Sequence, residues 1–421
     1  MRRNAKYRWI LGATALAALS AAAAPGTAAT TAAKGWQAPV LISKTQAARE
    51  TSLDINPKNN REMFVCDPSG VPAIGTGQSY FYRTVDGGKK WKYVDVETAT
   101  TDTRGYAFEG GDCDVAYDQG GTMWSADTWV GNLSIGHSKN GESWEGSALT
   151  TTAPVVDRPW LVGGPPGTLY VSYHDLQCCS PSAMWFTKTT DYGKTWTPAV
   201  PITTGNHEGA FVWEGNFVVA PGGKDIHLVY SRRVGGLASI GTPEIIALAS
   251  SHDGGLTWTS KTIASIPRET TSIYPSIGLD AGGYLHVVWA APRDDDDPVF
   301  YTQSKDKGAT WTKPRALNPG KSGYAPWVVG GKKGQARIVW LGSPQGKDAT
   351  DWYFYFAKID GSRTTVGTTT RKPMWVGSQT VPEFEMVRLD KKGKMHLGMS
   401  VFQKNPQGSG GVWAVFYQRE S

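Results

Sequence analysis

The sequence predicts an all-β protein in which one four-stranded antiparallel unit is repeated around a ring. Three observations lead to this prediction. A short motif with a central aspartate and a closing tryptophan recurs about every fifty residues, runs of strand composition precede each copy, and no amphipathic helix is found after residue 24. A fixed period of this length indicates an array of equal supersecondary units.

The repeated motif has the pattern S/T-x-D-x-G-x-T-W. Full copies span residues 189–196, 251–258 and 304–311; the copy at 84–91 differs at one position, that at 138–144 is one residue shorter, and Asp360 marks an eroded sixth copy. The aspartate can accept hydrogen bonds from its own turn, the glycine supplies a positive φ, and the tryptophan buries a large ring against the neighbouring unit. We therefore predict structural roles for Asp86, Asp191, Asp253, Asp306, Trp91, Trp196, Trp258 and Trp311.

Strands can be placed around each motif from composition. In the fifth unit, strand-like runs cover residues 275–280, 284–290 and 299–304, and a further run follows the motif at 313–317. The innermost strand of a unit can be placed seven times, near residues 52–55, 113–117, 158–162, 215–220, 275–279, 325–329 and 384–389. Four antiparallel strands per unit, with 50 Gly and 18 Trp, are typical of β-propeller blades.

The two ends of the chain indicate how the ring closes. Residues 412–419 resemble a third strand with no motif or fourth strand after it, and residues 35–40 mimic the segment 310–315 that follows a motif. The N-terminal strand is therefore predicted to complete the last blade, which removes exposed sheet edges. We predict one propeller over residues 35–421, with seven blades; six is the alternative.

Residues 1–29 have the features of a secretory signal. Arg2, Arg3, Lys6 and Arg8 precede an apolar run that ends at Ala24, and cleavage is expected after Ala24 or Ala29. The formal charge of +6 includes four positive charges from this segment. The remainder is nearly neutral, so we expect no nucleic-acid partner and, once the signal is removed, no membrane partner. The signal predicts secretion, and we expect a monomer.

Four cysteines in a secreted chain suggest two disulfides. Cys66 ends a second strand and Cys113 begins the next inner strand, so the two thiols are expected near the same face, and we predict a Cys66–Cys113 bond. Cys178 and Cys179 either form a vicinal bridge or bond to separate partners.

Polar residues gather in the segments that join strand two to strand three and each blade to the next. In this strand order the repeated turns lie on one face of the ring and these segments lie on the other, where loop-borne polar groups mark a binding or catalytic face. They are Asp67, Asp112, Asp127, Asp157, Arg158, His174, Asp175, His207, Glu208, Glu214, Arg232, Arg233, Arg293, Tyr324, Glu383 and Glu385.

The repeated motif resembles the Asp box, or bacterial neuraminidase repeat, of sialidase-like β-propellers. The segment 213–233 is similar to the fourth blade of sialidases, in which a glutamate opens an inner strand and an arginine follows on the next strand. By this resemblance Glu214 is a base, Tyr324 the nucleophile, and Arg232 and Arg293 hold a substrate carboxylate. Arg49 resembles the first-blade arginine, and Asp67 is the best match for the acid.

The chemistry that the resemblance implies is consistent. Arginines bind a carboxylate through charge-assisted hydrogen bonds, and sialidases use a tyrosine nucleophile because a neutral phenol is not repelled by that carboxylate. The chain differs from the family in three respects. The family's glutamate that holds the first-blade arginine has no match after residues 338–341. Glu50-Thr51 replaces the Ile-Pro that follows the first-blade arginine, and family catalytic domains have six blades rather than seven.

The sequence therefore predicts a sialidase-like glycoside hydrolase that releases an acidic terminal sugar from glycans. One alternative is a non-catalytic propeller that binds glycans or proteins; another is a polysaccharide lyase that uses His174 or His207 for proton transfer. Arg158, beside Asp157, is either a ligand clamp or part of a salt bridge between blades. No metal is required, although Asp294, Asp295, Asp296 and Asp297 could bind calcium.

Overall fold

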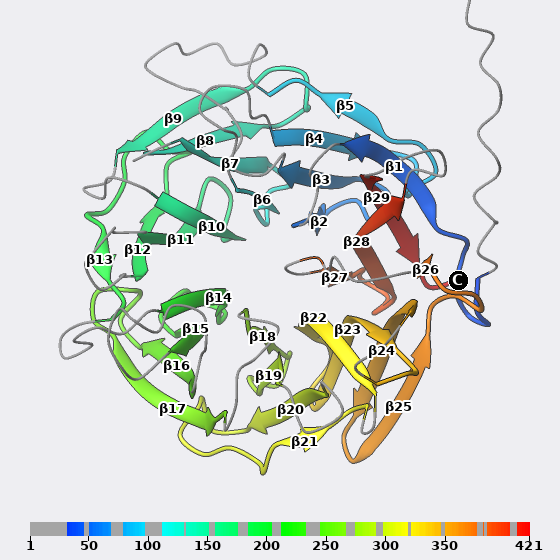
Figure 1. Ribbon diagram of the computed structural model, residues 1–421. Helices are drawn as coiled ribbons and strands as arrows, with labels where there is room; N and C mark the ends of the chain where they lie inside the picture. The colour runs from blue at the N-terminus through cyan, green and yellow to red at the C-terminus, as the bar shows by residue number, and fades with distance from the viewer. Residues whose placement is uncertain are drawn as a thin grey trace, which may run out of the picture.

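The computed structural model shows a ring of seven antiparallel sheets around a central axis (Figure 1). The structure describes residues 32–45, 50–68, 79–96, 112–129, 132–150, 156–175, 184–203, 212–232, 245–266, 274–291, 298–318, 321–346, 350–376, 382, 385–404 and 411–421. Within these ranges no helix is long and apolar enough to cross a membrane. The predicted all-β propeller with seven blades is confirmed.

The first four blades follow one another along the chain, each numbered from its innermost strand outward. Blade 1 contains β2 (Ser52–Ile55), β3 (Met63–Pro68), β4 (Ser79–Thr84) and β5 (Lys92–Val94). Blade 2 contains β6 (Cys113–Tyr117), β7 (Met123–Trp129), β8 (Asn132–Ser138) and β9 (Glu145–Thr150). Blade 3 contains β10 (Val156–Gly163), β11 (Leu169–Asp175), β12 (Met184–Thr189) and β13 (Val200–Pro201). Blade 4 contains β14 (Val212–Val219), β15 (Ile226–Arg232), β16 (Ile245–Ser251) and β17 (Thr259–Ser265).

The last three blades complete the ring. Blade 5 contains β18 (Ser276–Leu279), β19 (Leu285–Ala290), β20 (Val299–Ser304) and β21 (Arg315–Ala316). Blade 6 contains β22 (Ser322–Gly330), β23 (Gln335–Ser343), β24 (Asp351–Asp360) and β25 (Arg363–Thr368), and β26 (Trp375–Val376) also pairs with β24. Blade 7 contains β27 (Met386–Leu389), β28 (Met395–Lys404), β29 (Gly411–Arg419) and β1 (Val40–Thr45).

Blade 7 is built from both ends of the chain, as the sequence predicts. β1 pairs antiparallel with β29, from Val40 opposite Tyr417 to Thr45 opposite Trp413. Trp36, ahead of β1, is buried and lies 5.3 Å from the ring of Phe356 in blade 6. It packs on the preceding blade as the tryptophans of the repeated turns do, which explains why residues 35–40 mimic the segment after a turn.

The repeated turns have the predicted internal hydrogen bonds. In blade 4 the Asp253 carboxylate accepts the Thr257 N–H at 2.9 Å and the Thr257 hydroxyl at 2.6 Å, while the Ser251 hydroxyl accepts the Gly255 N–H at 2.8 Å. Asp191 and Asp306 make the corresponding bonds in blades 3 and 5. Hydrogen bonds from the threonine lower the pKa of each of these two carboxyls to about 2. The turn is therefore folded by residues within four positions of its aspartate.

Each turn also fastens its blade to the preceding one. Trp258 of blade 4 lies 5.4 Å from Phe186 of blade 3, and Trp91 of blade 1 lies 5.4 Å from Tyr417 of blade 7. The turn glycine permits this approach, since a Cβ at Gly255 would lie 2.0 Å from the Phe186 ring. The ring contacts of Trp258 and Trp91 are of the kind that the predicted structural role requires.

The sixth turn, around Asp360, is different. It is a tight hairpin between β24 and β25 in which Gly361 has a φ of 62°. The Asp360 carboxylate accepts a hydrogen bond from the Arg337 guanidinium at 3.0 Å. An arginine on the neighbouring strand thus replaces the threonine of the full motif as the carboxylate's side-chain donor.

A second repeated turn joins the first two strands of blades 5 and 7, and it is not among the turns that the sequence analysis predicts. Asp280 accepts the N–H groups of Gly282 and Tyr284 at 2.7 and 2.9 Å, and Asp390 accepts those of Lys392 and Lys394, both at 2.9 Å. The signal was visible, because residues 280–286 and 390–396 share the pattern D-x-x-G-x-[LM]-H.

The histidines that end this pattern are buried on the second strands. His286 and His396 lie at equivalent places in blades 5 and 7, and His227 takes the same place in blade 4. Burial lowers the pKa of His227 and of His396 to about 4, and it lowers the pKa of His286 as well. All three imidazoles are therefore neutral in the folded protein near neutral pH.

One disulfide joins blades 1 and 2 within the described residues. Cys66 of β3 and Cys113 of β6 are bonded, with 6.3 Å between their Cα atoms. The predicted Cys66–Cys113 pairing is confirmed. Cys178 and Cys179 lie outside the described residues, as does the predicted signal segment.

Replacing Gly255 with alanine should destabilise the ring through a clash between blades. The matched control is Gly222→Ala, because Gly222 has a φ of 90°, close to the 94° of Gly255, but a Cβ at Gly222 would have no neighbouring atom within 4 Å. We expect Gly255→Ala to lose about 1–3 kcal/mol more unfolding free energy than the control. Chemical denaturation measures this difference, and equal losses would show that the Gly255–Phe186 approach is unimportant.

The buried histidines should make the protein less stable in mild acid. Unfolded histidines take up protons near pH ~6.5, whereas His227 and His396 stay neutral to about pH 4 in the fold. Stability is then complete above about pH 6.5 and falls toward pH 4, since the unfolded state binds more protons. Unfolding free energy measured against pH should show this slope, and His227→Leu should reduce it. The raised pKa of Glu385 makes stability change with pH in the opposite direction. Because Glu385 is still present in His227→Leu, the difference between the two proteins reports the histidine alone.

Candidate functional site

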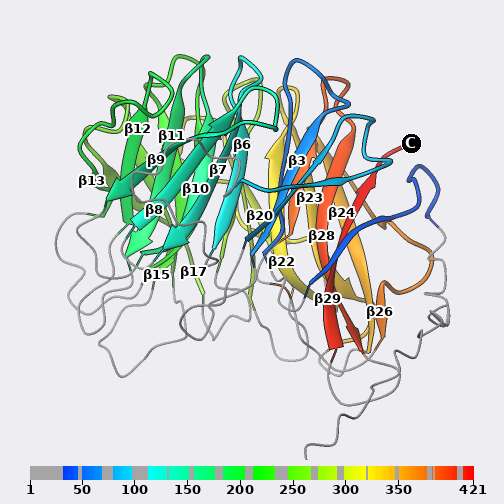
Figure 2. The same cartoon turned by 90° about the horizontal axis from the view of Figure 1, so that it is seen from above.

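The ring has two chemically different faces. The strands run between these faces, as Figure 2 shows from the side. One face carries the Asp-centred turns between strands three and four. The other, here called the inter-blade face, is where strands two and three, and successive blades, are connected. Among the predicted site residues that the structure describes, Asp67, Arg158, Glu214, Arg232 and Tyr324 lie near strand ends that reach this inter-blade face.

Three blades meet at Arg158, a residue near the start of β10 with a buried side chain. Arg158 is 1% exposed and its Nη1 donates to Glu50 Oε2 at 2.7 Å, which joins blade 3 to the segment that enters blade 1. The Arg158 backbone N–H donates to Asp112 Oδ2, ahead of β6 in blade 2, at 3.2 Å. Arg158 thus forms a salt bridge between blades, but its partner is Glu50.

Arg158 also belongs to a strained segment that occurs twice in the ring. The sequences Asp157–Trp160 and Tyr324–Trp327 both interrupt the pairing of an inner strand with its neighbour. Their second residues, Arg158 and Ala325, have φ values of 36° and 51°. A positive φ is unfavourable for a residue with a side chain, and such strain is common at functional sites.

The strained segments bring two indole rings together across the axis. The rings of Trp160 and Trp327 lie 5.2 Å apart and are both buried. The Arg158 guanidinium lies 4.6 Å from the Trp160 ring centre, and the Arg388 guanidinium lies 6.0 Å from that of Trp327. Two arginines therefore flank an aromatic pair in the channel, in an arrangement that favours cation–π attraction.

A cavity of about 330 Å³ occupies the channel toward the Asp-centred turns. All seven inner strands contribute to its wall, including Asp54, Asp114, Asn216, Trp327 and Arg388. Burial raises the pKa of Asp54 and of Asp114, against the opposing charges of Arg388 and Arg158 respectively. Both carboxylates accept backbone N–H groups of the next blade, from Tyr117 and Leu161, each at 2.7 Å. Their visible role is to join inner strands.

A carboxyl pair lies where blade 7 meets blade 1. Glu385 is fully buried and accepts the Ser400 N–H through both of its oxygens, at 3.1 and 2.9 Å. Burial raises its pKa well above the usual range, and the charge of Asp67 on β3 raises it further. Asp67 and Glu385 are both among the polar residues that the sequence predicts for this face, Asp67 as the acid, but their interaction with each other is not predicted.

The residues predicted from the sialidase resemblance are spread over several blades. Glu214, 1% exposed, lies on β14 opposite Tyr230, and Arg232 ends β15 of the same blade. Tyr324, 4% exposed, lies on β22 in blade 6, with its ring 5.5 Å from that of Trp352. The inner strand of blade 5 stands between these two blades.

Two further predicted groups can be placed, and several cannot. His174 is buried at the end of β11, opposite Asp157 in the strand register. Arg49, Arg293, His207 and the acidic run Asp294, Asp295, Asp296 and Asp297 lie outside the described residues. Within the described ranges no cluster of three or more His, Cys, Asp or Glu side chains could hold a metal ion.

The chain matches the BNR repeat-like domain family over residues 115–380. No curated protein matches it significantly. Among solved structures it is similar to an ulvan lyase bound to -[GlcA(1-4)Rha3S]-, with a TM-score of 0.57, 13% identity, and coverage of 89% of this chain and 95% of that one. A protein of unknown function from Dyadobacter fermentans has a TM-score of 0.51 at 14% identity, covering 92% and 100%. A sialidase from Streptococcus pneumoniae has a TM-score of 0.46 at 10% identity, covering 92% and 70%.

The ion pair between Glu50 and Arg158 should be essential for the architecture of this face. Glu50→Gln leaves the guanidinium buried without its charged partner, and we expect it to cost about 3–5 kcal/mol of unfolding free energy. Arg158→Met removes the other partner of the ion pair. In a double-mutant cycle the combined loss should be clearly smaller than the sum of the two single losses. Strictly additive losses would contradict a direct interaction.

Proposed function

The chain belongs to the BNR repeat-like domain family, and we propose that it is a secreted, glycan-active enzyme that works at its inter-blade face. The observation that carries this proposal is the gathering of ionisable groups where inner strands begin. Glu50, Asp112, Arg158, Glu214 and Glu385 come from five different blades or their approaches, and the last three are buried. Burying such groups is costly, and their concentration at one end of a channel is typical of catalytic sites.

We assign the reaction to a sialidase-like glycoside hydrolase acting on an acidic terminal sugar. Tyr324 Oη would attack the anomeric carbon while Glu214 takes the phenolic proton, and Asp67 would protonate the leaving oxygen. Water would then cleave the tyrosyl–sugar bond. Arg232, Arg293 and Arg49 would hold the sugar carboxylate, with Arg158 as a further cation. The strained backbone directly after Tyr324 supports a functional role for this position.

A lyase acting on a uronate-containing polysaccharide is the second candidate. His174 on β11 lies opposite Asp157 of β10 in the strand register, and Asp157 is followed in the chain by Arg158. His174, as the base, and Arg158, as the cation, therefore occupy neighbouring positions on two paired strands. Elimination needs a base to remove the proton beside the uronate carboxylate, and a cation to stabilise the resulting charge. The similarity to the ulvan lyase extends to the fold alone.

Two assays separate the candidates. Release of a fluorophore from a sialic-acid glycoside reports hydrolysis, and ultraviolet absorbance of unsaturated sugars from ulvan or another uronate polymer reports elimination. Tyr324→Phe should abolish hydrolysis, with a loss of at least about a hundredfold, whereas His174→Gln should abolish elimination. Tyr353→Phe, on the outer part of blade 6, is the matched control and should keep wild-type turnover.

The results decide between catalysis and simple binding. Turnover in either assay that the corresponding variant loses would support the assignment of its residue. If the folded wild type turns over neither a sialoside nor any uronate polymer, the enzymatic proposal is wrong, and a glycan- or protein-binding propeller takes its place.

A further inference from the structure

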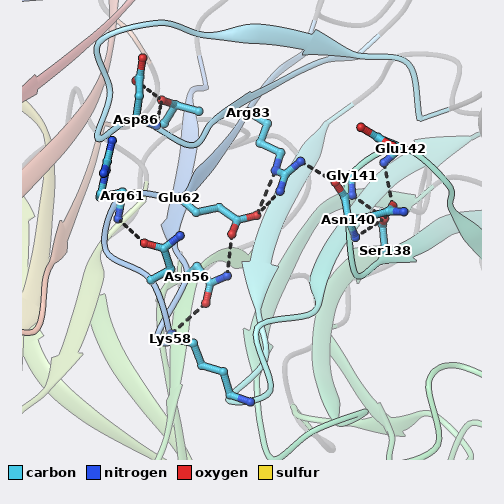
Figure 3. Close-up of polar contacts among 12 residues, drawn as sticks. Asn56, Lys58, Arg61, Glu62, Arg83, Asp86, Ser138, Asn140, Gly141 and Glu142 are labelled. Carbon is cyan, nitrogen blue, oxygen red and sulfur yellow. Dashed lines mark hydrogen bonds and ion pairs between the residues drawn. The ribbon is translucent and has the colours of Figure 1, made fainter.

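A groove of about 810 Å³ lies on the other side of the molecule, between the Asp-centred turns of blades 1 and 2. Its walls come from the turn and outer strand of blade 1, and from Gly141 and Glu142 of blade 2. Figure 3 shows Arg83 at this junction, directed toward both Glu62 and Asn140. Arg83 donates to Glu62 Oε1 at 2.9 and 2.7 Å and also to the Asn140 carbonyl, so it ties the two blades beside the groove.

The blade 1 turn departs from the others at the position that faces this groove. Lys90 stands where blades 3, 4 and 5 have Thr195, Thr257 and Thr310. In those three turns the threonine hydroxyl donates to the second carboxylate oxygen at 2.6 Å. Asp86 receives its hydrogen bonds from the turn at Oδ1 alone, and no described residue donates to its Oδ2. A carboxylate oxygen and a lysine therefore border the groove in place of a closed side-chain hydrogen bond.

The tryptophan of this turn is also held differently. Trp258 and Trp311 donate their indole N–H to the turn glycine carbonyl at 3.1 Å, whereas the Trp91 N–H has no acceptor among the described residues. Trp91 packs edge-on against Tyr417 and lines the groove. The blade 1 turn has thus lost two of the interactions that stabilise the turns of blades 4 and 5.

The groove combines apolar surface with balanced charge. Val85 and Tyr93 are 55% and 40% exposed, which is high for side chains of this size and kind. The charged groups of the lining are three cations and three anions: Arg83, Lys90, Lys92, Asp86, Asp95 and Glu142. Because Arg83 is paired with Glu62, the groove has no excess of positive charge. Nucleic acids and strongly anionic polymers require such an excess.

This chemistry fits a neutral ligand rich in hydroxyl groups. An aromatic ring offers a flat apolar surface, and carboxylates and ammonium groups accept from and donate to hydroxyls. A sugar ring has one relatively apolar face and hydroxyls around its edge. We propose that the groove is a carbohydrate-binding site for a neutral stretch of polysaccharide, in which Tyr93 supplies the apolar contact and Asp86 and Lys90 supply hydrogen bonds. It is separate from the inter-blade face and does not depend on the reaction proposed there.

Affinity gel electrophoresis with soluble neutral polysaccharides tests the proposal. The probes are a β-glucan, a xylan, an arabinan and a galactomannan, with polygalacturonate as an acidic comparison. We expect at least one neutral polymer to retard the wild-type protein. Tyr93→Ala and Lys90→Thr should each weaken that affinity by about tenfold or more, because a lost anchor contact of about 1.4 kcal/mol corresponds to tenfold. Leu256→Ala, which removes an exposed side chain from the blade 4 turn, should bind like the wild type.

Lys90→Thr separates lost binding from lost folding. It restores the consensus threonine, whose hydroxyl should close onto Asp86 Oδ2, so thermal stability should stay the same or rise while affinity falls. Tyr324→Phe should leave binding to the neutral polymer unchanged, which distinguishes this site from the proposed reaction. The proposal is overturned if no neutral polysaccharide retards the protein, if only polygalacturonate does, or if Tyr93→Ala and Lys90→Thr bind as the wild type does.

Discussion

The pairing of β1 with β29 is the constraint on which the whole ring depends. It joins residues near the two ends of the chain in one sheet, and neighbouring contacts reinforce it, since the Ser421 N–H donates to the Gly35 carbonyl at 2.9 Å. Without this pairing β29 would present an open edge, and the other six blades would have no fixed circumference. A closed ring fixes how the inner strands face the axis, so the site at their ends also depends on this pairing.

The blades are joined around the axis by side chains bonded to the backbone of the next blade. Asn216 of blade 4 donates to the Ile277 carbonyl and accepts the Ile277 N–H, both at 2.8 Å, and Asp280 of blade 5 accepts the Gly334 N–H at 2.5 Å. The first two bonds satisfy backbone groups of the inner strand β18, and the third satisfies a backbone N–H in the turn between β22 and β23. Polar groups near the channel are therefore expected even without catalysis, and Asp54 and Asp114 belong to this structural class.

The two faces divide structural and chemical roles between them. On the face of the Asp-centred turns, the carboxylates of Asp191, Asp253 and Asp306 are bonded at both oxygens by residues within four positions, whereas the blade 1 turn bonds Asp86 at one oxygen only and borders a groove. On the inter-blade face, Arg158, Glu50 and Glu385 are held by partners from other blades or strands. Backbone strain also distinguishes the inter-blade face. Arg158 and Ala325 both have a positive φ, and each directly precedes a Pro-Trp pair.

The sequence alone was sufficient for the turns, the seven inner strands, the closure of blade 7 and the Cys66–Cys113 bond. The turns and strands follow from local chemistry repeated at a fixed period, since a turn such as that of Asp253 is complete within the residues that surround it. The closure and the disulfide follow from where that period places the ends of the chain and the two cysteines. Only the tertiary structure decided that Arg158 pairs with Glu50, 108 residues away, that Trp160 meets Trp327, and that Glu385 is buried near Asp67. These contacts depend on which blades face one another across or around the ring. The spacing of motifs along the sequence does not determine that arrangement.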